Sequence, residues 1–275
     1  MTTVRYENMD GRATITLDRP ETLNSMNHEL MTDLRHALER VQEDESVRVV
    51  VLTGAGRGFC SGADLSTVGD GTDSALVAEV DAPAPDGGEG TDEDDAFLPA
   101  MRALATCPVP TIGRINGVAA GGGFGLAMAC DISIAARSAF FVATFGPRLG
   151  IVPDLGTTWH LPLLVGPARA RGISMLGGRI PAEQAAQWGL IWDVVDDSAL
   201  DTTVDEVADQ FKRSSPDAMT RIRSSIADAE RNSLDQQLDL EFEHQRHLIP
   251  RNMVEGAAAF LERREPVFDS ARQRT

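Results

Sequence analysis

The stretch "GVAAGGGFGLAMACD" (117–131) joins three consecutive glycines to an apolar run with the composition of a helix. It contains no Lys, Ser or Thr that would hold a phosphate. Glycines between a strand and a helix let the backbone approach a neighbour closely, because they have no Cβ. The first amides of a helix are also free to donate hydrogen bonds. The stretch therefore predicts either a site built from backbone donors or tight packing of a helix against a strand.

A second glycine-rich stretch, "TGAGRGFCSGADL" (53–65), raises the same question earlier in the chain. Each stretch follows a predicted strand, at 47–54 and at 110–116. The spacing in "GAGRG" (54–58) is not the G-x-G-x-x-G that holds a dinucleotide pyrophosphate. Two amides, one from each loop, instead predict an oxyanion hole, a pair of N–H donors for a carbonyl oxygen that gains negative charge.

Composition excludes several classes of function. The chain has 275 residues, is 42% hydrophobic and carries a net charge of −17, which disfavours nucleic acid and anionic membrane surfaces as partners. An apolar N-terminal signal and a membrane span are both missing from the sequence, so we expect a cytoplasmic protein. The cysteines are odd in number and match no metal spacing, so we interpret them as reduced core thiols: Cys60, Cys107 and Cys130.

Hydrophobic periodicity predicts an α/β core followed by helices. "RATITL" (12–17) and "VRVVVLTG" (47–54) are predicted strands, and the helix between them (27–44) has Asn27 at its N-cap. This strand–helix–strand unit predicts a partly parallel sheet. Further strands are predicted at 110–116, 131–136, 139–144 and 190–195, and helices at 216–231, 233–249 and 252–264. The division is a core of 1–197 and a helical region of 198–275.

One segment, 69–96, differs from the rest of the core. It carries ten acids and no Lys or Arg, and without these acids the net charge would be −7. Its Gly and Pro content predicts a mobile loop inserted into the core. Two interpretations stay open, a solvated excursion and a lid over a site.

The two glycine loops, taken with four further stretches, resemble the crotonase or enoyl-CoA hydratase/isomerase superfamily nearly from end to end. The resemblance implies an α/β crotonase-like spiral of ββα units with a C-terminal helical trimerisation region. It also implies a coenzyme A thioester as substrate, a homotrimer or dimer of trimers, and no metal or redox cofactor. The stretches that carry it are 17–27, 50–65, 115–136, 149–166, 176–195 and 260–268.

By the same resemblance, the amides of Ala63 and Gly122 are the pair that holds the thioester oxygen. Hydratases of the family resemble one another in having two glutamates, whose positions here fall on Gly125 and at or near Phe145. The remaining candidate acid is Asp154 in "VPDLGTT", which resembles the acid of the isomerase branch, including ring-epoxide isomerases. Its apolar neighbours are expected to raise its pKa. The alternative role for Asp154 is to cap the next helix.

The resemblance also implies where the rest of the substrate lies. The turn near Arg19 and the loop at Asp64 and Leu65 border the nucleotide of coenzyme A. Arg263 or Arg264, from the same or a neighbouring subunit, meets a phosphate, with a solvated helix end as the alternative.

The preferred function is double-bond isomerisation of an enoyl-CoA by Asp154. The alternatives are an enoyl-CoA hydratase of fatty-acid β-oxidation and a non-catalytic acyl-CoA-binding homologue. The other polar residues are interpreted as structural rather than catalytic. His160 is interpreted as a supporting or surface histidine, His244 and His247 lack a third metal ligand, Cys60 and Ser61 pack their loop, and Asp131 is a structural acceptor.

Overall fold

The computed structural model describes residues 2–66 and 96–268. The acidic segment 69–96 therefore lies outside the described residues, apart from Ala96. Within the described ranges, no helix is both long enough and apolar enough to cross a membrane.

The larger of two sheets has six strands in the order β1-β2-β3-β5-β7-β10. β1 pairs antiparallel with β2, and every other neighbouring pair in this sheet is parallel. The predicted parallel sheet is thus confirmed. Its strands are β1 (Val4–Met9), β2 (Arg12–Leu17), β3 (Val49–Gly54), β5 (Thr111–Ile115), β7 (Ile132–Ala136) and β10 (Asp193–Val195).

The smaller sheet has the order β4-β6-β8-β9, with only the last pair antiparallel. Each strand pair β3/β4, β5/β6 and β7/β8 gives its first strand to the larger sheet and its second to the smaller one. The chain therefore winds as a spiral, and the two sheets are built together. The smaller sheet contains β4 (Gly58–Cys60), β6 (Val118–Ala120), β8 (Phe140–Val142) and β9 (Ile180–Pro181).

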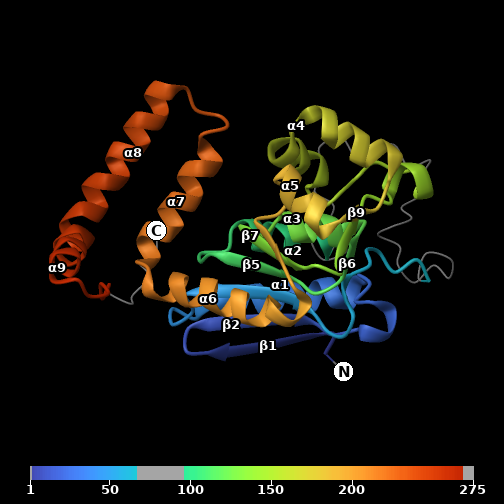
Figure 1. Cartoon of the computed structure of the whole chain (residues 1–275), viewed down its shortest axis with the longest axis horizontal. Coiled ribbons are helices and arrows are strands. Elements are labelled where there is room, and N and C mark those ends of the chain that lie inside the picture. The colour runs from blue at the N-terminus through green and yellow to red at the C-terminus, as the bar shows by residue number, and fades with distance from the viewer. Residues whose placement is uncertain (1, 67–95, 269–275) are drawn as a thin grey trace.

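Helices cover the sheets and form the C-terminal part (Figure 1). α1 begins as predicted, because the Asn27 side chain accepts a hydrogen bond of 2.9 Å from the Leu30 amide. The helices are α1 (His28–Glu43), α2 (Phe97–Ala105), α3 (Gly122–Met128), α4 (Thr157–Leu176, kinked at Gly166), α5 (Ala182–Trp188), α6 (Leu200–Arg213), α7 (Pro216–Asp228), α8 (Leu234–Leu248) and α9 (Val254–Glu262), with short helical turns at η1 (Pro20–Thr22), η2 (Phe145–Leu149), η3 (Asp197–Ala199) and η4 (Ile249–Met253).

α6 belongs with the sheet although it lies beyond residue 197. Its residues Leu200, Val204 and Ala208 are buried in the hydrophobic core, where the helix packs on β3, β5 and β7. The cysteines are also in this core, all buried thiols outside any disulfide, as expected: Cys60, Cys107 and Cys130. The division of the chain at 197/198 stays a prediction.

α7, α8 and α9 extend away from the sheets as an arm (Figure 1). Arg223 ties the base of α7 to the core, because its guanidinium donates to Asp131 at 2.6 Å and to the Leu104 carbonyl at 3.1 Å. Asp131 also accepts from the amide and hydroxyl of Thr111, so its expected role as a structural acceptor is confirmed.

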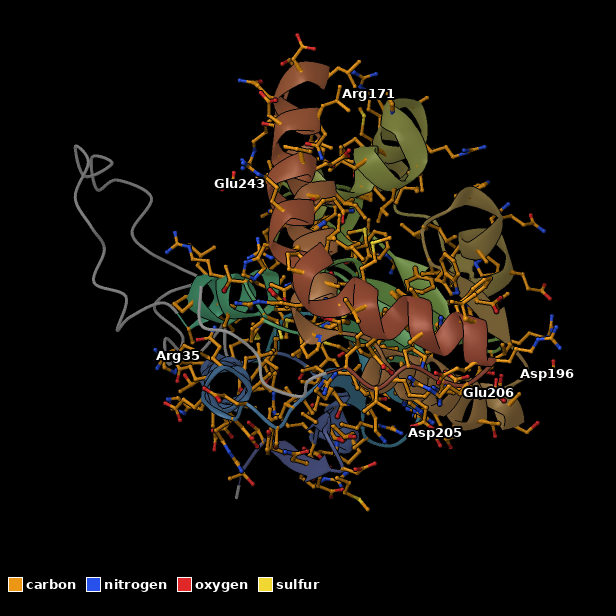
Figure 2. All side chains as sticks on the ribbon, turned by 90° about the vertical axis from the view of Figure 1, so that its left-hand side faces the viewer. Arg35, Arg171, Asp196, Asp205, Glu206 and Glu243 are labelled. Carbon is orange, nitrogen blue, oxygen red and sulfur yellow. The ribbon has the colours of Figure 1, made fainter. Side chains whose placement is uncertain are left out.

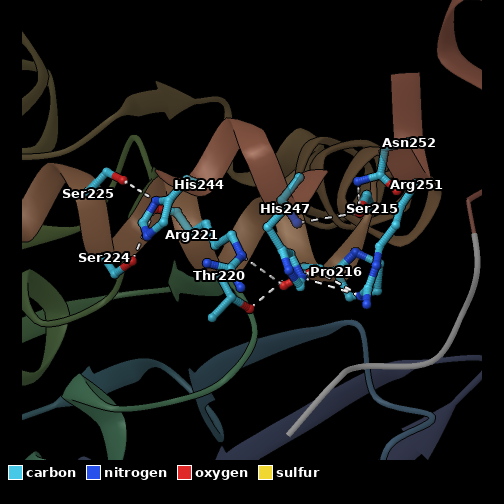
Figure 3. A network of polar contacts seen from close by, with 12 residues as sticks. Ser215, Pro216, Thr220, Arg221, Ser224, Ser225, His244, His247, Arg251 and Asn252 are labelled. Atoms are coloured by element: carbon cyan, nitrogen blue, oxygen red, sulfur yellow. Dashed lines mark hydrogen bonds and ion pairs between the residues drawn. The ribbon is translucent and has the colours of Figure 1, made fainter. Parts of the chain in front are cut away.

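Polar contacts join α7 to α8 within the arm (Figure 3). His247 lies 2.8 Å from Asp217, and the Nδ1 of His244 lies 2.9 Å from the Ser225 hydroxyl. The two histidines therefore hold the helical hairpin together. No three potential metal ligands gather in the described part of the chain.

Some charged surface residues form ion pairs between different helices and strands. Figure 2 shows Asp196, Asp205 and Glu206 on the same side. Asp196 accepts from Arg137 at 2.8 Å, and Asp205 pairs with Arg12. Exposed pairs of this kind add little stability each, so the fold depends on its core.

Candidate active site

The three consecutive glycines have different structural roles. Gly121 has a φ of 51° and precedes the first residue of α3, a conformation that favours glycine. A Cβ on Gly123 would lie 2.3 Å from the Cys60 carbonyl oxygen, so this position packs the helix directly against β4. Gly122, between them, places its amide at the start of α3. The packing interpretation is confirmed at Gly123, and the interpretation as a backbone donor stays a prediction for Gly122.

The loop after β4 is held from one side by a short parallel bridge. The Met26 amide donates to the Gly62 carbonyl at 2.8 Å, and the Asp64 amide donates to the Met26 carbonyl at 2.8 Å. Because alternate residues of an extended segment direct their amides to opposite sides, the Ala63 amide faces away from Met26.

The loop after β6 contacts the opposite side of this loop. A Cβ on Gly62, which has a φ of 93°, would lie 2.8 Å from the Ala120 carbonyl oxygen and 3.4 Å from the Gly121 Cα. Gly62 and Gly121 immediately precede Ala63 and Gly122, so the two predicted donors come from loops in van der Waals contact. Among the described residues, neither of these two amides donates to a protein acceptor.

Asp154 lies in a turn that contacts α3 at Gly122, one of the two predicted donors. Leu155 and Gly156 both have positive φ, 48° and 78°. The turn directs the Leu155 side chain onto α3, where its Cδ1 would be 2.9 Å from a Cβ on Gly122. Asp154 is therefore one residue from a side chain that touches a predicted donor.

The Asp154 side chain does not cap α4. Gly156 is the N-cap residue, no side chain caps this helix, and the Thr157 amide donates instead to the backbone carbonyl of Asp154 at 2.9 Å. The capping alternative is therefore wrong. Two successive left-handed residues make the chain turn too sharply for the carboxylate to reach the first amides of the helix.

Desolvation by the surrounding protein raises the pKa of the Asp154 carboxyl above its ordinary value of 3.8, and a hydrogen bond from its own backbone lowers it by less. The residue is nevertheless exposed to solvent over much of its surface, so this desolvation is partial. The described residues include no ion-pair partner for it. Nearby, burial lowers the pKa of half-buried His160, whose ring meets Trp159 edge-on at 4.7 Å.

The positions of the two family glutamates hold no acid, and the first of them is tightly packed. A Cβ on Gly125 would lie 3.0 Å from both the Leu155 carbonyl oxygen and the hydroxyl oxygen of buried Thr157. A longer side chain there would displace the turn that carries Asp154. Phe145, at the second position, is a buried apolar residue.

Two of the residues expected to border coenzyme A are joined to each other. Arg19 donates to Asp64 at 2.7 Å and to the Ser25 carbonyl at 2.7 Å. Desolvation raises the pKa of Asp64, but hydrogen bonds from Ser66, Arg19 and Ser25 outweigh it and lower the pKa to about 2. This ion pair braces the turn against the loop, and Leu65 beside it is exposed.

The other two basic residues are not brought to this place within one chain. Arg263 and Arg264 follow α9 at the far end of the arm, apart from α3 and β6 (Figure 1). Arg264 donates to Glu255 at 2.6 and 2.9 Å and to Glu262 at 2.7 Å, whereas the Arg263 side chain forms no ion pair in the described chain.

Sequence analysis missed Met26 and Leu155, whose side chains both lie against Gly122. The Met26 sulfur would be 3.0 Å from a Cβ on this glycine. Met26 sits in a quoted stretch of the family resemblance, but only the bridge to Ala63 reveals what it does.

Comparison with known proteins shows which family the chain is similar to. The model of the enoyl-CoA hydratase/isomerase family matches residues 7–272. A 1,2-epoxyphenylacetyl-CoA isomerase of Escherichia coli K12 is 45% identical over 94% of this chain and 95% of its own. A protein of Rhodobacter capsulatus named "probable enoyl-CoA hydratase" is 40% identical over 97% of both chains. The crystal structure of an enoyl-CoA hydratase from Bacillus anthracis superposes with a TM-score of 0.85 at 30% identity, covering 98% of this chain and 99% of its own.

The tight contact at Gly123 leads to a stability prediction. Gly123→Ala is expected to cost about 1–3 kcal/mol in the free energy of unfolding, because its Cβ would overlap the Cys60 backbone. Gly172→Ala in α4 is the matched control, since nothing lies within 4 Å of its Cβ. The control is expected to be neutral or to add about 0.5–1 kcal/mol. Urea unfolding of both variants measures the difference, and equal midpoints would contradict the packing described.

Proposed function

Because the chain belongs to the enoyl-CoA hydratase/isomerase family and acts on acyl-CoA thioesters, we propose that it isomerises the double bond of an enoyl-CoA. The observation that carries this proposal is the number of acids. Asp154 carries a partly desolvated carboxyl and precedes Leu155, which touches Gly122, whereas neither position of the hydratase glutamates holds an acid. One carboxyl group suffices to move a proton from one carbon to another, whereas addition of water is helped by two.

In the proposed reaction, the Asp154 carboxylate removes a proton from C2 of a 3-enoyl-CoA. The electron pair moves into the thioester carbonyl and gives a dienolate, whose oxygen accepts hydrogen bonds from the amides of Ala63 and Gly122. The protonated Asp154 then returns its proton to C4, which yields the conjugated 2-enoyl-CoA and restores the carboxylate. Each such amide typically contributes roughly 3–4 kcal/mol to transition-state stabilisation.

A second candidate substrate comes from one relative. The 45% identity to a 1,2-epoxyphenylacetyl-CoA isomerase supports rearrangement of a ring epoxide by the same residues. Both reactions use an enolate-like thioester and one acid, so they differ in the acyl group rather than in the machinery.

A substrate comparison tests the reaction type. The protein is mixed with a 3-enoyl-CoA, crotonyl-CoA or 1,2-epoxyphenylacetyl-CoA, and absorbance and products are followed. We expect conversion of the first or the third and little hydration of crotonyl-CoA, because Gly125 and Phe145 supply no second acid. Robust hydration would establish the hydratase alternative, and no turnover of any thioester would favour the non-catalytic binding protein.

Asp154→Asn tests the proton carrier. We expect kcat to fall about 10²–10⁴-fold, because the amide accepts no proton. The wild-type kcat/KM should rise with pH through the raised pKa of Asp154, since the base must be ionised.

Desolvation of the charged form of Asp154 also makes native stability fall as pH rises through that pKa. The variant should therefore unfold at pH 7 no earlier than wild type.

Glu243→Gln on α8, labelled in Figure 2, is the control for loss of one negative charge outside the loops of the candidate site. It should leave turnover unchanged. An Asp154→Asn variant that turns over at the wild-type rate would remove this residue from the mechanism.

We also propose that the arm makes the protein a homotrimer or a dimer of trimers. Its helices leave large apolar side chains in solvent, with Phe260 82% and Leu261 80% exposed and with Ile226 and Phe242 also exposed. Surfaces of this kind are typical of interfaces. In such an assembly Arg263, which has no ion-pair partner in the described chain, is the better placed of the two basic residues to meet a coenzyme A phosphate of a neighbour.

Sedimentation equilibrium tests the assembly. Wild type is expected at a multiple of three chains, and Phe242→Glu with Phe260→Glu is expected to shift the distribution to smaller species, because a charge would be buried at the interface. A monomeric wild type would contradict the proposal.

A further inference from the structure

Asn24 is fully buried in the turn that precedes Met26. Its side-chain nitrogen donates to the carbonyl oxygens of Ala55 at 3.0 Å, Gly58 at 2.9 Å and Phe59 at 3.2 Å. Its side-chain oxygen accepts from the Arg19 amide at 2.9 Å. Its φ of 58° is one that asparagine adopts more readily than most residues. The side chain therefore fastens this turn to the segment 55–59.

Asn116 is also hydrogen-bonded to the segment 55–59. Its side-chain nitrogen donates to the carbonyl oxygens of Gly56 at 3.0 Å and Gly58 at 3.1 Å. Its side-chain oxygen accepts from the Gly54 amide at 3.3 Å. Asn116 lies between β5 and β6, so it fastens that connection to the same segment. The carbonyl oxygen of Gly58 thus accepts hydrogen bonds from both Asn24 and Asn116.

Each asparagine belongs to the segment that places one of the two candidate donors. Asn24 is two residues before Met26, whose backbone bridges Ala63. Asn116 directly precedes the short connection into β6, and β6 leads through Gly121 to Gly122. The shared acceptor at Gly58 therefore connects the position of one amide to the position of the other.

The segment between them has little freedom to shift. A Cβ on Gly54 would lie 2.3 Å from the Gly58 carbonyl oxygen, and a Cβ on Gly117 would lie 2.1 Å from the Arg57 carbonyl oxygen. The backbones are packed in direct contact. Loss of the Asn24 donors would remove a hydrogen bond from the buried Phe59 carbonyl, and loss of the Asn116 donors would remove those that hold the connection between β5 and β6 to this segment, so either loss would allow the contact to open.

We propose that Asn24 and Asn116 are positioning residues that clamp the Gly58 carbonyl through their shared hydrogen bonds and thereby fix the separation of the Ala63 and Gly122 amides. The clamp rests on the proposed function only in that the amide pair holds a thioester oxygen. It acts on charge development at that oxygen, so it governs kcat more than the binding of the nucleotide part of the ligand.

The test measures polarisation of a bound thioester as well as turnover. A dialkylaminocinnamoyl-CoA absorbs at longer wavelength when hydrogen bonds polarise its carbonyl, because its excited state places negative charge on that oxygen. The variants are Asn24→Ser and Asn116→Ser, and Asn116→Asp, which keeps the size of the side chain but loses its donors. Half-buried Asn116 is the milder site if Asn24→Ser unfolds. Val204→Ala, on the buried face of α6, is the control for loss of stability alone.

We expect each asparagine variant to bind the probe within about threefold of wild type and to lose much of its red shift. The kcat for the 3-enoyl-CoA should fall about 10–100-fold, the effect of misplacing catalytic groups by a fraction of an ångström to one ångström. The double variant should lose less than the product of the single effects, because both side chains act on one carbonyl. Val204→Ala should keep the wild-type shift.

Asparagine variants that fold and keep the full red shift would overturn the clamp and leave the amide pair standing. Equal losses in Val204→Ala would also overturn it. If the wild-type protein binds the probe with no red shift, the amide pair itself fails, and the clamp fails with it.

Discussion

The contact between two backbones, at Gly62 and Gly121, is the constraint on which the site depends. Both positions leave little room for a side chain. A Cβ on Gly62 would lie 2.8 Å from the Ala120 carbonyl oxygen, and a Cβ on Gly121 would lie 3.0 Å from the Thr144 hydroxyl oxygen. Both residues also adopt positive φ. The spiral brings β4 and β6 side by side, and these glycines allow the loops after the strands to stay as close as the strands themselves.

The turn at Asp154 fills the space that an acid on α3 would need. Leu155 in a left-handed conformation costs about 1–2 kcal/mol, so the surrounding contacts must hold it there. Its carbonyl then lies against Gly125 and its side chain against Gly122. An acid at 125 would crowd this turn, because even its Cβ would lie only 3.0 Å from the Leu155 carbonyl oxygen. The chain has the turn, and with it a single, partly desolvated carboxyl beside the loops.

Charge and apolar surface are distributed unevenly over the molecule. The chain carries a net charge of −17, yet its most buried ion pair, Arg19 with Asp64, braces the site and is locally neutral. The arm, in contrast, exposes large apolar side chains while its internal polar groups are paired across α7 and α8. Core and arm are therefore stabilised differently, the first by burial within one chain and the second by a few polar contacts that leave its apolar faces uncovered.

Local sequence patterns predicted α1 with its two flanking strands, further strands of both sheets and the helices of the arm. They did not predict β1, β4, α2 or α4. Periodicity and end signals predicted the helix α1, its N-cap at Asn27 and the parallel strands β2 and β3 that flank it. The sequence by itself also determined that two glycine loops follow two strands. Only the tertiary structure decided which glycine packs, which one turns and which one presents an amide, since these depend on atoms distant in the chain. It decided likewise that Asp154 does not cap its helix, because two left-handed residues redirect the backbone, and that Asn24 and Asn116 meet at one carbonyl oxygen, a coincidence that no local pattern encodes.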